Sequence, residues 1–295
     1  MSNVNKPISH KWEPITDLPA NYLSLSSADF TAKAKEWLAL KPLIKDEVFS
    51  KFLDRIKNEW VIELGNVENI YFINDKLTET LVEEGLYSIE LPHQGNSTVV
   101  VDPHTFFYSH EEVFNALYDM ARAKTQISPY LIRGIHAVLT ENQVSAPGID
   151  PFGRKINIPL AKGIFKKWPN NPTTANGSIH QYCPPEQVDS EISRLLHLHE
   201  DHINKNVPIE IEAAWFHHRF IQIHPFQDGN GRVGRALTAL IFIKNGLFPP
   251  IVKLNDKKKY LINLELADKD NLKPLIDYFS NLVASKITKC IEYIK

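Results

Sequence analysis

Twelve consecutive residues bring together side chains that the packing of a core does not require. From His224 to Arg235 the chain reads His-Pro-Phe-Gln-Asp-Gly-Asn-Gly-Arg-Val-Gly-Arg, which supplies a base, a carboxylate, an amide between two glycines and two guanidiniums. Residues 211–221 and 236–243 are apolar on almost every side, which is typical of buried helices. Because the glycines interrupt this pattern, the sequence predicts a helix, a tight polar loop and a second helix.

The predicted start of the second helix is suited to an anion. Gly229, Asn230 and Gly231 fall where the first backbone N–H groups of a helix lack partners and the helix dipole is positive. Arg232 and Arg235 lie three residues apart, nearly on one face, and a guanidinium binds phosphate through two parallel hydrogen bonds. The pattern therefore predicts a phosphate cradle.

Two further side chains of the loop add chemistry to this cradle. Asp228 offers hard oxygen ligands beside the phosphates, which suits Mg²⁺. His224 stands at the mouth of the loop as a candidate general base. Phe226 is apolar within a polar loop, so we expect it to anchor the loop in the core. A base, a phosphate cradle and a metal carboxylate together indicate attack of a hydroxyl on phosphorus.

The stretch resembles, at every defining position, the Fic-family signature HxFx[DE]GNGRxxR, and the resemblance covers most of the chain. It implies a mainly α fold: a Fic-type helical bundle with a small β-hairpin flap and an N-terminal helical extension. The domains expected are an N-terminal helical region with an inhibitory helix, residues 1–108, and a catalytic domain, residues 109–295, with its core at about 130–281.

Local signals predict where the helices begin and end. Capping residues and apolar periodicity predict helices at 28–38, 46–60, 60–72, 75–84, 113–124 and from 129 onward. In this reading Gly85 closes the fourth helix and Ser109 caps the fifth. Residues 86–101 are expected to form a loop or a short strand pair.

The segment from Gln143 to Pro185 is rich in proline and glycine, which excludes a helix. Two short runs in it, Gly163–Lys166 and Ile179–Tyr182, are predicted to pair as a hairpin. The resemblance implies that such a flap clamps a target peptide by strand addition. The alternative is a decorated surface loop. The residues expected to bind the target are Ile164, Phe165, Ile179, His180, Gln181 and Tyr182.

The resemblance further implies a reaction and its substrate. ATP would be attacked at its α-phosphate, so that AMP is transferred to a Ser, Thr or Tyr hydroxyl of a target protein. His224 would be the base, and Asp228 would hold Mg²⁺. Tyr260 would lie near the adenine, or else simply pack in the core, and Asp268 stands where the family has an asparagine. The residues predicted to bind ATP are Gly229, Asn230, Gly231, Arg232, Val233, Gly234, Arg235 and Tyr260.

Many Fic proteins carry an inhibitory motif, [ST]xxxE[GN], whose glutamate pairs with the second arginine of the signature. Residues 80–85 match this motif literally and would assign the role to Glu84. Residues 64–69 lack the Ser or Thr, but their Val-Glu-Asn core lies in an apolar helix and resembles the family's Ile-Glu-Gly. We therefore prefer Glu68, with Glu84 as the alternative. Other classes left open are a related phosphotransferase or deAMPylase, and a non-enzymatic peptide-binding module.

Composition bounds the remaining possibilities. The 295 residues are 43% hydrophobic with a net charge of −2, and without a basic block we expect no nucleic-acid binding. No apolar run approaches the roughly 20 residues of a membrane span, and two cysteines without CxxC spacing favour a reducing compartment, so we expect a cytoplasmic protein. His197, His199 and His202 crowd together without a metal-binding spacing and are expected to decorate a helix end. The target and the oligomeric state stay unknown.

Overall fold

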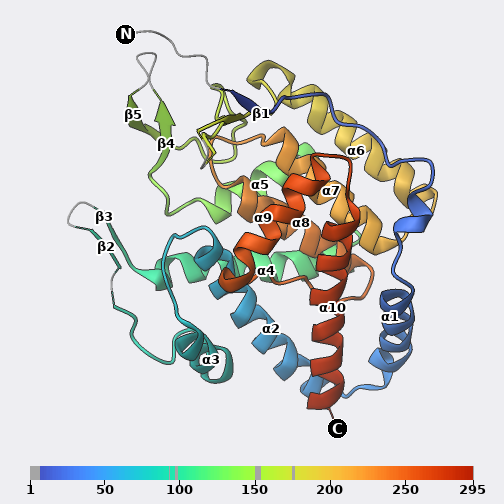
Figure 1. Ribbon diagram of the computed structural model, residues 1–295. Coiled ribbons are helices and arrows are strands. Elements are labelled where there is room, and N and C mark those ends of the chain that lie inside the picture. Colours follow the sequence, from blue (N-terminus) through green and yellow to red (C-terminus); the bar gives the residue numbers. More distant parts are fainter. Residues whose placement is uncertain (1–6, 93, 97–98, 150–153, 175–176, 295) are drawn as a thin grey trace.

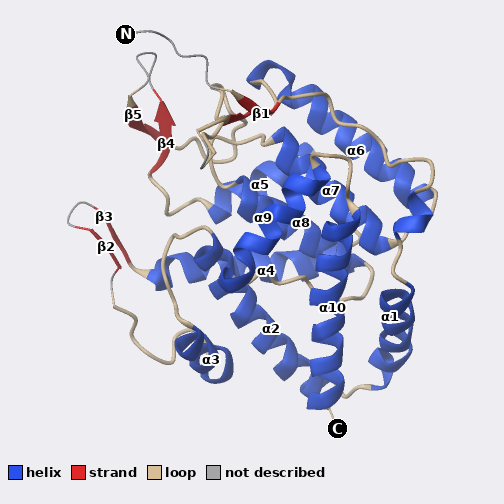
Figure 2. Ribbon diagram, in the orientation of Figure 1, coloured by secondary structure: helices blue, strands red, loops and turns tan. Residues whose placement is uncertain are grey.

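The computed structural model describes residues 7–92, 94–96, 99–149, 154–174 and 177–294, and these form a mainly helical body (Figures 1 and 2). The α-helices are α1 (Ala28–Leu40), α2 (Asp46–Val67), α3 (Asp75–Glu84), α4 (Pro103–Arg122), α5 (Pro129–Leu139), α6 (Val188–Asn204), α7 (Ile209–Ile223), α8 (Asn230–Lys244), α9 (Lys257–Ala267) and α10 (Lys273–Tyr293). Short 3-10 helices are η1 (Tyr22–Leu25), η2 (Lys41–Leu43), η3 (Pro185–Gln187) and η4 (Leu254–Asp256). The strands are β1 (Ile8–His10), β2 (Gln94–Asn96), β3 (Val99–Val101), β4 (Ser145–Ile149), β5 (Lys155–Pro159) and β6 (Ile179–His180).

The centre of the body is the pair α7 and α8, the two helices predicted on either side of the polar loop. They pack against each other, while α4 and α5 cover α8, and α6 and α10 cover α7 (Figure 1). Their apolar residues are buried on almost every side, as the sequence pattern predicts. The polar loop is therefore held between two helices that the surrounding bundle fixes in place. None of the helices in the described ranges is long and apolar enough to cross a membrane.

Three of the predicted helix ends are confirmed by their capping contacts. Ser27 and Ser128 accept the N–H groups of Phe30 and Leu131 at the starts of α1 and α5. Gly85 follows α3 with φ +110°, a conformation that a glycine adopts without strain. These ends depend on local chemistry, which is why the sequence predicts them.

Two helical predictions need correction. Residues 46–60 and 60–72 were expected as separate helices, but α2 runs unbroken to Val67 because an apolar face continues along it. Ser109 does not cap a helix: it is buried inside α4, where its hydroxyl donates to the carbonyl of Phe106. α4 begins at Pro103, with the carboxylate of Asp102 accepting the N–H of His104. The expected boundary between residues 108 and 109 therefore falls within one continuous helix.

The strands form two-stranded pairs at the edge of the helical body. β2 and β3 form an antiparallel hairpin, which confirms the strand-pair alternative for residues 86–101. β4 and β5 form a second antiparallel hairpin, and both hairpins project from the same side of the body in Figure 2. β6 pairs in parallel with β1, the arm at the start of the described chain.

The predicted pairing of Gly163–Lys166 with Ile179–Tyr182 is wrong. The backbone N–H of Lys166 donates to the carbonyl of Pro225 (2.8 Å), so the first run is attached to the polar loop instead of forming a strand. The second run supplies β6, whose partner is β1. A short apolar run does not specify the strand with which it pairs, and here β6 pairs with β1 of the N-terminal arm.

Buried histidines make this fold sensitive to acid. Burial lowers the pKa of His110 and His217 to about 3 and that of His136 to about 4, against about 6.5 in an unfolded chain. Between these values only the unfolded chain binds the protons. The resulting stability is complete above pH 6.5 and is lost as the pH falls, with a slope of up to about 1.4 kcal/mol per pH unit for each histidine. The pKa of His202 is instead raised in the folded chain, so its contribution to stability changes with pH in the opposite direction.

We therefore expect the urea midpoint of unfolding to fall clearly between pH 7 and pH 5. His110→Gln should make this dependence shallower, because the variant loses one of the buried histidines whose pKa is lowered. His197→Ala, a change at an exposed histidine on α6, should leave it unaltered. A midpoint that is equal or higher at pH 5 would contradict the assignment of neutral buried imidazoles.

Candidate active site

The polar loop between α7 and α8 is shaped by two left-handed residues. His224 follows α7 with φ 51° and ψ 59°, and Gly229 precedes α8 with φ 80°. A Cβ atom at Gly229 would lie 2.9 Å from the Cγ2 atom of Thr140, so the loop approaches α5 too closely for a side chain there. Phe226 has an exposed fraction of 0% and stacks on His136 with ring centroids 3.8 Å apart. Its predicted role as the anchor of the loop is confirmed.

Asn230 holds the loop together from inside. Its Oδ1 atom accepts the N–H of Phe226 (2.8 Å), and its Nδ2 atom donates to the carbonyl of the same residue (2.8 Å). The same Nδ2 atom lies 3.0 Å from Nδ1 of His224. The side chain of Asn230 thus stabilises the loop. The group of this residue that is suited to an anion is its backbone N–H, in the first turn of α8.

His224 is held on its Nδ1 atom by two amides. Besides Asn230, the Nδ2 atom of Asn170 lies 2.8 Å away and also donates to the carbonyl of Phe226 (2.7 Å). The Oδ1 atom of Asn170 faces Nζ of Lys166 (2.8 Å), which fixes the orientation of the amide. Because both amides present N–H groups, Nδ1 acts as an acceptor, and the neutral imidazole carries its proton on Nε2.

The ring of His224 is further fixed by Tyr182, which stacks on it with centroids 3.8 Å apart and planes 2° from parallel. The backbone N–H of Tyr182 donates to Oδ1 of Asn171 (2.9 Å), so neighbouring asparagines hold both members of the stack. Burial, with the positive charge of Lys166 nearby, holds the pKa of His224 well below its ordinary value. At neutral pH the imidazole is therefore uncharged.

A chain of polar contacts links the end of α5 to Asp228. The guanidinium of Arg232 donates to the carbonyl of Leu139 (2.8 Å) and to Oε1 of Gln143. The Nε2 atom of Gln143 donates in turn to Oδ2 of Asp228, whose Oδ1 atom accepts the N–H of Gly229 (2.7 Å). Arg232 is 2% exposed, and in this structure its guanidinium links the loop to the end of α5.

The half-buried carboxylate of Asp228 fits the Mg²⁺ expected from the sequence. Both of its oxygens accept hydrogen bonds from N–H groups, as an ionised carboxylate does, and each keeps lone pairs for a further ligand. Mg²⁺ in nucleotide sites is typically held by one or two carboxylates together with substrate phosphates. Asp228 is thus the residue that would hold the metal.

Arg235 is paired with Glu68. Nη2 of Arg235 lies 2.7 Å from Oε1 of Glu68, and the two side chains are 5% and 29% exposed. The carboxylate lies directly on Gly231, where a Cβ atom would be 2.4 Å from the same oxygen. Burial alone would raise the pKa of Glu68, but the charges of Arg235 and Arg232 lower it overall, so the carboxylate is ionised.

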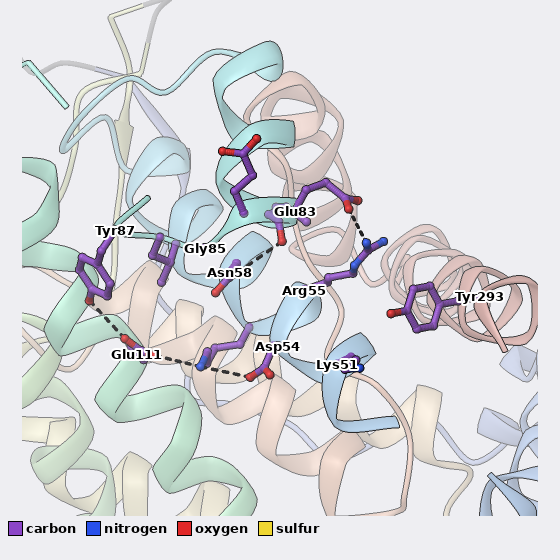
Figure 3. Close-up of a pocket in the computed structure, with 13 residues that line it drawn as sticks. Lys51, Asp54, Arg55, Asn58, Glu83, Gly85, Tyr87, Glu111 and Tyr293 are labelled. Atoms are coloured by element: carbon purple, nitrogen blue, oxygen red, sulfur yellow. Dashed lines mark hydrogen bonds and ion pairs between the residues drawn. The ribbon is translucent and has the colours of Figure 1, made fainter. Parts of the chain in front are cut away.

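Glu84, the alternative inhibitory residue, lies in a different place. It lines a surface cavity of about 520 Å³ between α2, α3 and the end of α10, shown in Figure 3. Charged side chains of this cavity pair with one another: Arg55 with Glu83, and Lys57 with Asp54 and Glu111. The residues that line the cavity come from outside the His224–Arg235 loop, so Glu84 is not placed to pair with Arg235.

Three of the residues predicted to bind ATP are packed against neighbouring helices in this structure. Val233 is 0% exposed, and its N–H donates to the carbonyl of Gly229 (3.0 Å) within the helix. A Cβ atom at Gly234 would lie 3.0 Å from Cδ1 of Ile221, so this glycine lets α8 approach α7. Tyr260 is 3% exposed, and its hydroxyl lies 2.7 Å from Nε2 of His217. The structure therefore favours the core-packing alternative for Tyr260.

The residues predicted for the flap are dispersed. Ile164 is exposed, whereas Phe165 is buried against Phe226 under the guanidinium of Arg133. Ile179 and His180 form β6, and Tyr182 lies on His224. Gln181 bonds through its N–H to the carbonyl of His10. Most of this group thus surrounds the catalytic histidine or the N-terminal arm, and the projecting hairpin is β4–β5.

Sequence reasoning missed four residues that shape the site: Gln143, Lys166, Asn170 and the neutral His136, which bonds the carbonyl of Asp228. Apart from His136, they come from the proline-rich segment between α5 and α6. A single amide or lysine in such a segment carries no spacing that distinguishes it from a solvated loop residue. His136 lies in the helix predicted from residue 129 onward, and that prediction gave it no role in the site.

Known proteins are similar to part of this chain. The Fic/DOC family model matches residues 126–242. Protein adenylyltransferase fic-1 of Caenorhabditis elegans is 30% identical over 112 residues, which span 38% of this chain and 22% of that relative. A Fido domain-containing protein of Dictyostelium discoideum is 34% identical over 90 residues, spanning 30% of this chain and 62% of that relative.

Solved structures agree on the fold. A Fic domain containing signaling protein from Bacteroides thetaiotaomicron superposes with a TM-score of 0.73 at 21% identity, covering 90% of this chain and 97% of that one. A fragment of Fic-1 from C. elegans gives a TM-score of 0.67 at 17% identity, covering 90% and 70%. The helical bundle and its polar loop define a Fic/DOC-type domain. Residues 126–242 of this chain belong to the Fic/DOC family, and the chain shares the fold of solved Fic-domain structures.

The tautomer of His224 can be tested by changing its partner. Asn170→Asp replaces an N–H donor with a carboxylate, which favours a proton on Nδ1 and raises the pKa of His224 by about 1 to 3 units. The measurement is the titration of the His224 ring by NMR. The same change at Asn21, an exposed residue of the N-terminal arm, is the matched control and should leave that pKa unaltered. An unshifted His224 in the Asn170 variant would contradict the contact.

Proposed function

We propose that this chain is a protein adenylyltransferase that moves AMP from ATP to a Ser, Thr or Tyr hydroxyl of a target protein. The observation that carries this proposal is that His224, Asp228 and the start of α8 belong to one short loop, in which Asn230 contacts the ring of His224. A module that only bound peptides would not need an imidazole beside a phosphate cradle. The Fic/DOC family model matches residues 126–242, which contain this loop, and relatives named protein adenylyltransferase are 30% and 32% identical over 112 and 84 residues.

In this proposal the backbone does most of the binding. The first N–H groups of α8, at Asn230, Gly231 and Arg232, point along the positive end of the helix dipole and would receive the phosphates. Arg235 would hold the γ-phosphate once it is released from Glu68. Mg²⁺ held by Asp228 would neutralise charge on the α- and β-phosphates.

The transfer itself is a displacement at phosphorus. The target hydroxyl oxygen forms a bond to the α-phosphorus, the bond from that phosphorus to the pyrophosphate oxygen breaks, and pyrophosphate leaves. His224 takes the hydroxyl proton. Since Nδ1 of this ring contacts Asn170 and Asn230, Nε2 is the nitrogen left to meet the hydroxyl. That nitrogen must lose its resting proton first, so the amides around Nδ1 have to rearrange before transfer.

The resting tautomer supports a second candidate, removal of AMP from a modified target. A proton on Nε2 is what a general acid needs to protonate the departing hydroxyl oxygen. In the same state the ionised carboxylate of Glu68 lies on Gly231, beside the proposed phosphate cradle. In this candidate reaction that carboxylate would activate a water molecule. The two candidates share one site and differ in the state of His224 and Glu68.

We further propose that β4–β5 is the hairpin that receives the target segment. Its two strands form a sheet with free edges, and strand addition is a common way to bind an extended peptide. β4 begins two residues after Gln143, which contacts Asp228, so a strand added here would lie close to the cradle. The reaction is proposed for the cytoplasm, because Cys183 and Cys290 are both free.

The test is incubation of the purified protein with lysate and ATP labelled on either the α- or the γ-phosphate. Label from the α-phosphate should enter protein, and removal of Mg²⁺ by a chelator should abolish its entry. His224→Ala should lose transfer while binding ATP nearly as well as the wild type, because the imidazole contacts the hydroxyl and not the phosphates. Entry of γ-label alone would identify a kinase-type phosphotransferase and overturn the proposal. Transfer by His224→Ala at the wild-type rate would remove the histidine from the reaction.

A further inference from the structure

Two histidines far apart in the sequence face each other where the N-terminal arm meets the catalytic domain. His10 ends β1 and His180 ends β6, and the two residues are partners in the parallel register. Their rings stack with centroids 4.5 Å apart and planes 18° from parallel. The stack is partly buried, and no requirement of the strand pair calls for two imidazoles there.

A carboxylate completes the group. Asp268 follows the C-terminal end of α9, and its Oδ2 atom lies 4.0 Å from Nε2 of His180. His10, His180 and Asp268 each offer one ligand atom, and the three atoms lie within 4.8 Å of one another. Nε2 of His10 is buried, and in the described ranges it has no hydrogen-bond partner. A buried ring nitrogen without a partner is unfavourable unless something else binds it.

The protonation states suit a cation. Burial lowers the pKa of His180 despite the nearby Asp268, so its imidazole is neutral and keeps a lone pair. Burial would raise the pKa of Asp268, but the hydrogen bond and charge of His218 lower it overall, so the carboxylate is ionised. Two imidazole nitrogens and one carboxylate oxygen are the donor set of open zinc sites and of two-histidine, one-carboxylate iron sites.

The carboxylate is also oriented from behind. Nε2 of His218, on α7, lies 2.8 Å from Oδ1 of Asp268, which leaves Oδ2 directed to the histidine pair. Hydrogen bonds of this kind to a ligating carboxylate are typical of metal sites in proteins.

From these contacts we propose that His10, His180 and Asp268 bind one divalent transition-metal ion of the Zn²⁺ class. The three ligand atoms would approach one another slightly to reach ordinary metal–ligand distances, and a fourth position would stay open to solvent. The ion would link the N-terminal arm to β6 and to the end of α9. This site is separate from the expected Mg²⁺ ligand, Asp228.

The crowded histidines of α6 do not compete as an equivalent site. Nδ1 of His199 and Nδ1 of His202 both contact Glu212, and Nε2 of His202 contacts Asp17 (2.6 Å). These ring nitrogens already have hydrogen-bond partners, whereas Nε2 of His10 has none in the described part of the chain. Crowding in the sequence is therefore a weaker indicator of a metal site than an unpartnered nitrogen.

The metal would stabilise the surroundings of the catalytic histidine. The rings of His180 and Tyr182 lie 4.8 Å apart, and Tyr182 stacks on His224. An ion that fixes β6 thus also fixes the strand that leads to this stack. Binding of the metal does not require the proposed transfer reaction, so the two can be tested independently.

The experiment is Zn²⁺ binding by the full chain, without a polyhistidine tag and in excess Mg²⁺, measured by calorimetry and by metal content after dialysis. The wild type should bind one Zn²⁺ per chain at this site, and added Zn²⁺ should raise its melting temperature. His10→Ala and His180→Ala should each weaken binding at least tenfold. His197→Ala, which changes an exposed histidine on α6, is the matched control and should bind as the wild type does.

Asp268→Asn keeps the shape of the carboxylate but removes its charge, and it guards against variants that fail to fold. It should retain the wild-type melting temperature without metal and lose the increase on adding Zn²⁺. Cobalt substitution should give the visible absorption bands of a four-coordinate ion in the wild type and not in the Asp268 variant. The proposal is overturned if the wild type binds no Zn²⁺, or if the His10 and Asp268 variants bind it as tightly as the wild type.

Discussion

The ion pair between Glu68 and Arg235 is the contact on which the state of this site depends. The guanidinium of Arg235 cannot bind a carboxylate and a γ-phosphate at the same time. In this structure it is bound to the carboxylate of Glu68. Gly231 allows the pair to form, because any Cβ atom there would collide with the carboxylate oxygen. In the proposed reaction, the occupant of Arg235 would determine whether the phosphates can align along α8.

The position of Glu68 is set by the turn that ends α2. Asn66 clamps this turn by accepting the N–H of Ile73 (2.8 Å) and donating to its carbonyl (2.9 Å), while Asn69 adopts φ 55°. The ring of Tyr71 folds back over Gly65, where a Cβ atom would lie 2.2 Å from the Cζ atom of the tyrosine. The carboxylate is thus presented by a rigid turn. A signal that frees Arg235 has to move this turn or turn the Glu68 side chain alone.

His224, the proposed base, is held in a state that matches this occupied arginine. Asn170 and Asn230 keep the proton of His224 on Nε2, so the imidazole is arranged to give a proton and not to take one. The segment that supplies Asn170 is also bonded to the polar loop, because the backbone N–H of Lys166 donates to the carbonyl of Pro225. We infer that nucleotide position and histidine tautomer change together between the resting and the transferring states.

Much of this arrangement could be predicted from the sequence because it is local. The spacing from His224 to Arg235 specifies the helix, loop and helix, the caps at Ser27 and Ser128 specify where helices begin, and the apolar context of Glu68 distinguishes it from Glu84. These features depend on residues within a few positions of one another.

The remainder could not be predicted because it depends on contacts between distant segments. Gln143 and Asn170 acquire roles only when an irregular segment folds against the loop, and its strands had no pattern that specified their partners. Tyr260 is buried because His217 accepts its hydroxyl, a pairing between separate helices. His10, His180 and Asp268 come from the two ends and the middle of the chain, so the sequence offers no spacing to indicate a ligand set.

The most direct test of the account is self-modification by the variants Glu68→Gly and Glu84→Gly, measured side by side with α-labelled ATP. If Glu68 withholds Arg235 from the γ-phosphate, its removal should raise incorporation by about 100-fold, the effect of correcting a small misalignment of the reacting phosphate. ATP affinity should change much less, and Glu84→Gly should behave as the wild type. Activation by the Glu84 change, or by neither change, would contradict the central role of the Glu68–Arg235 pair.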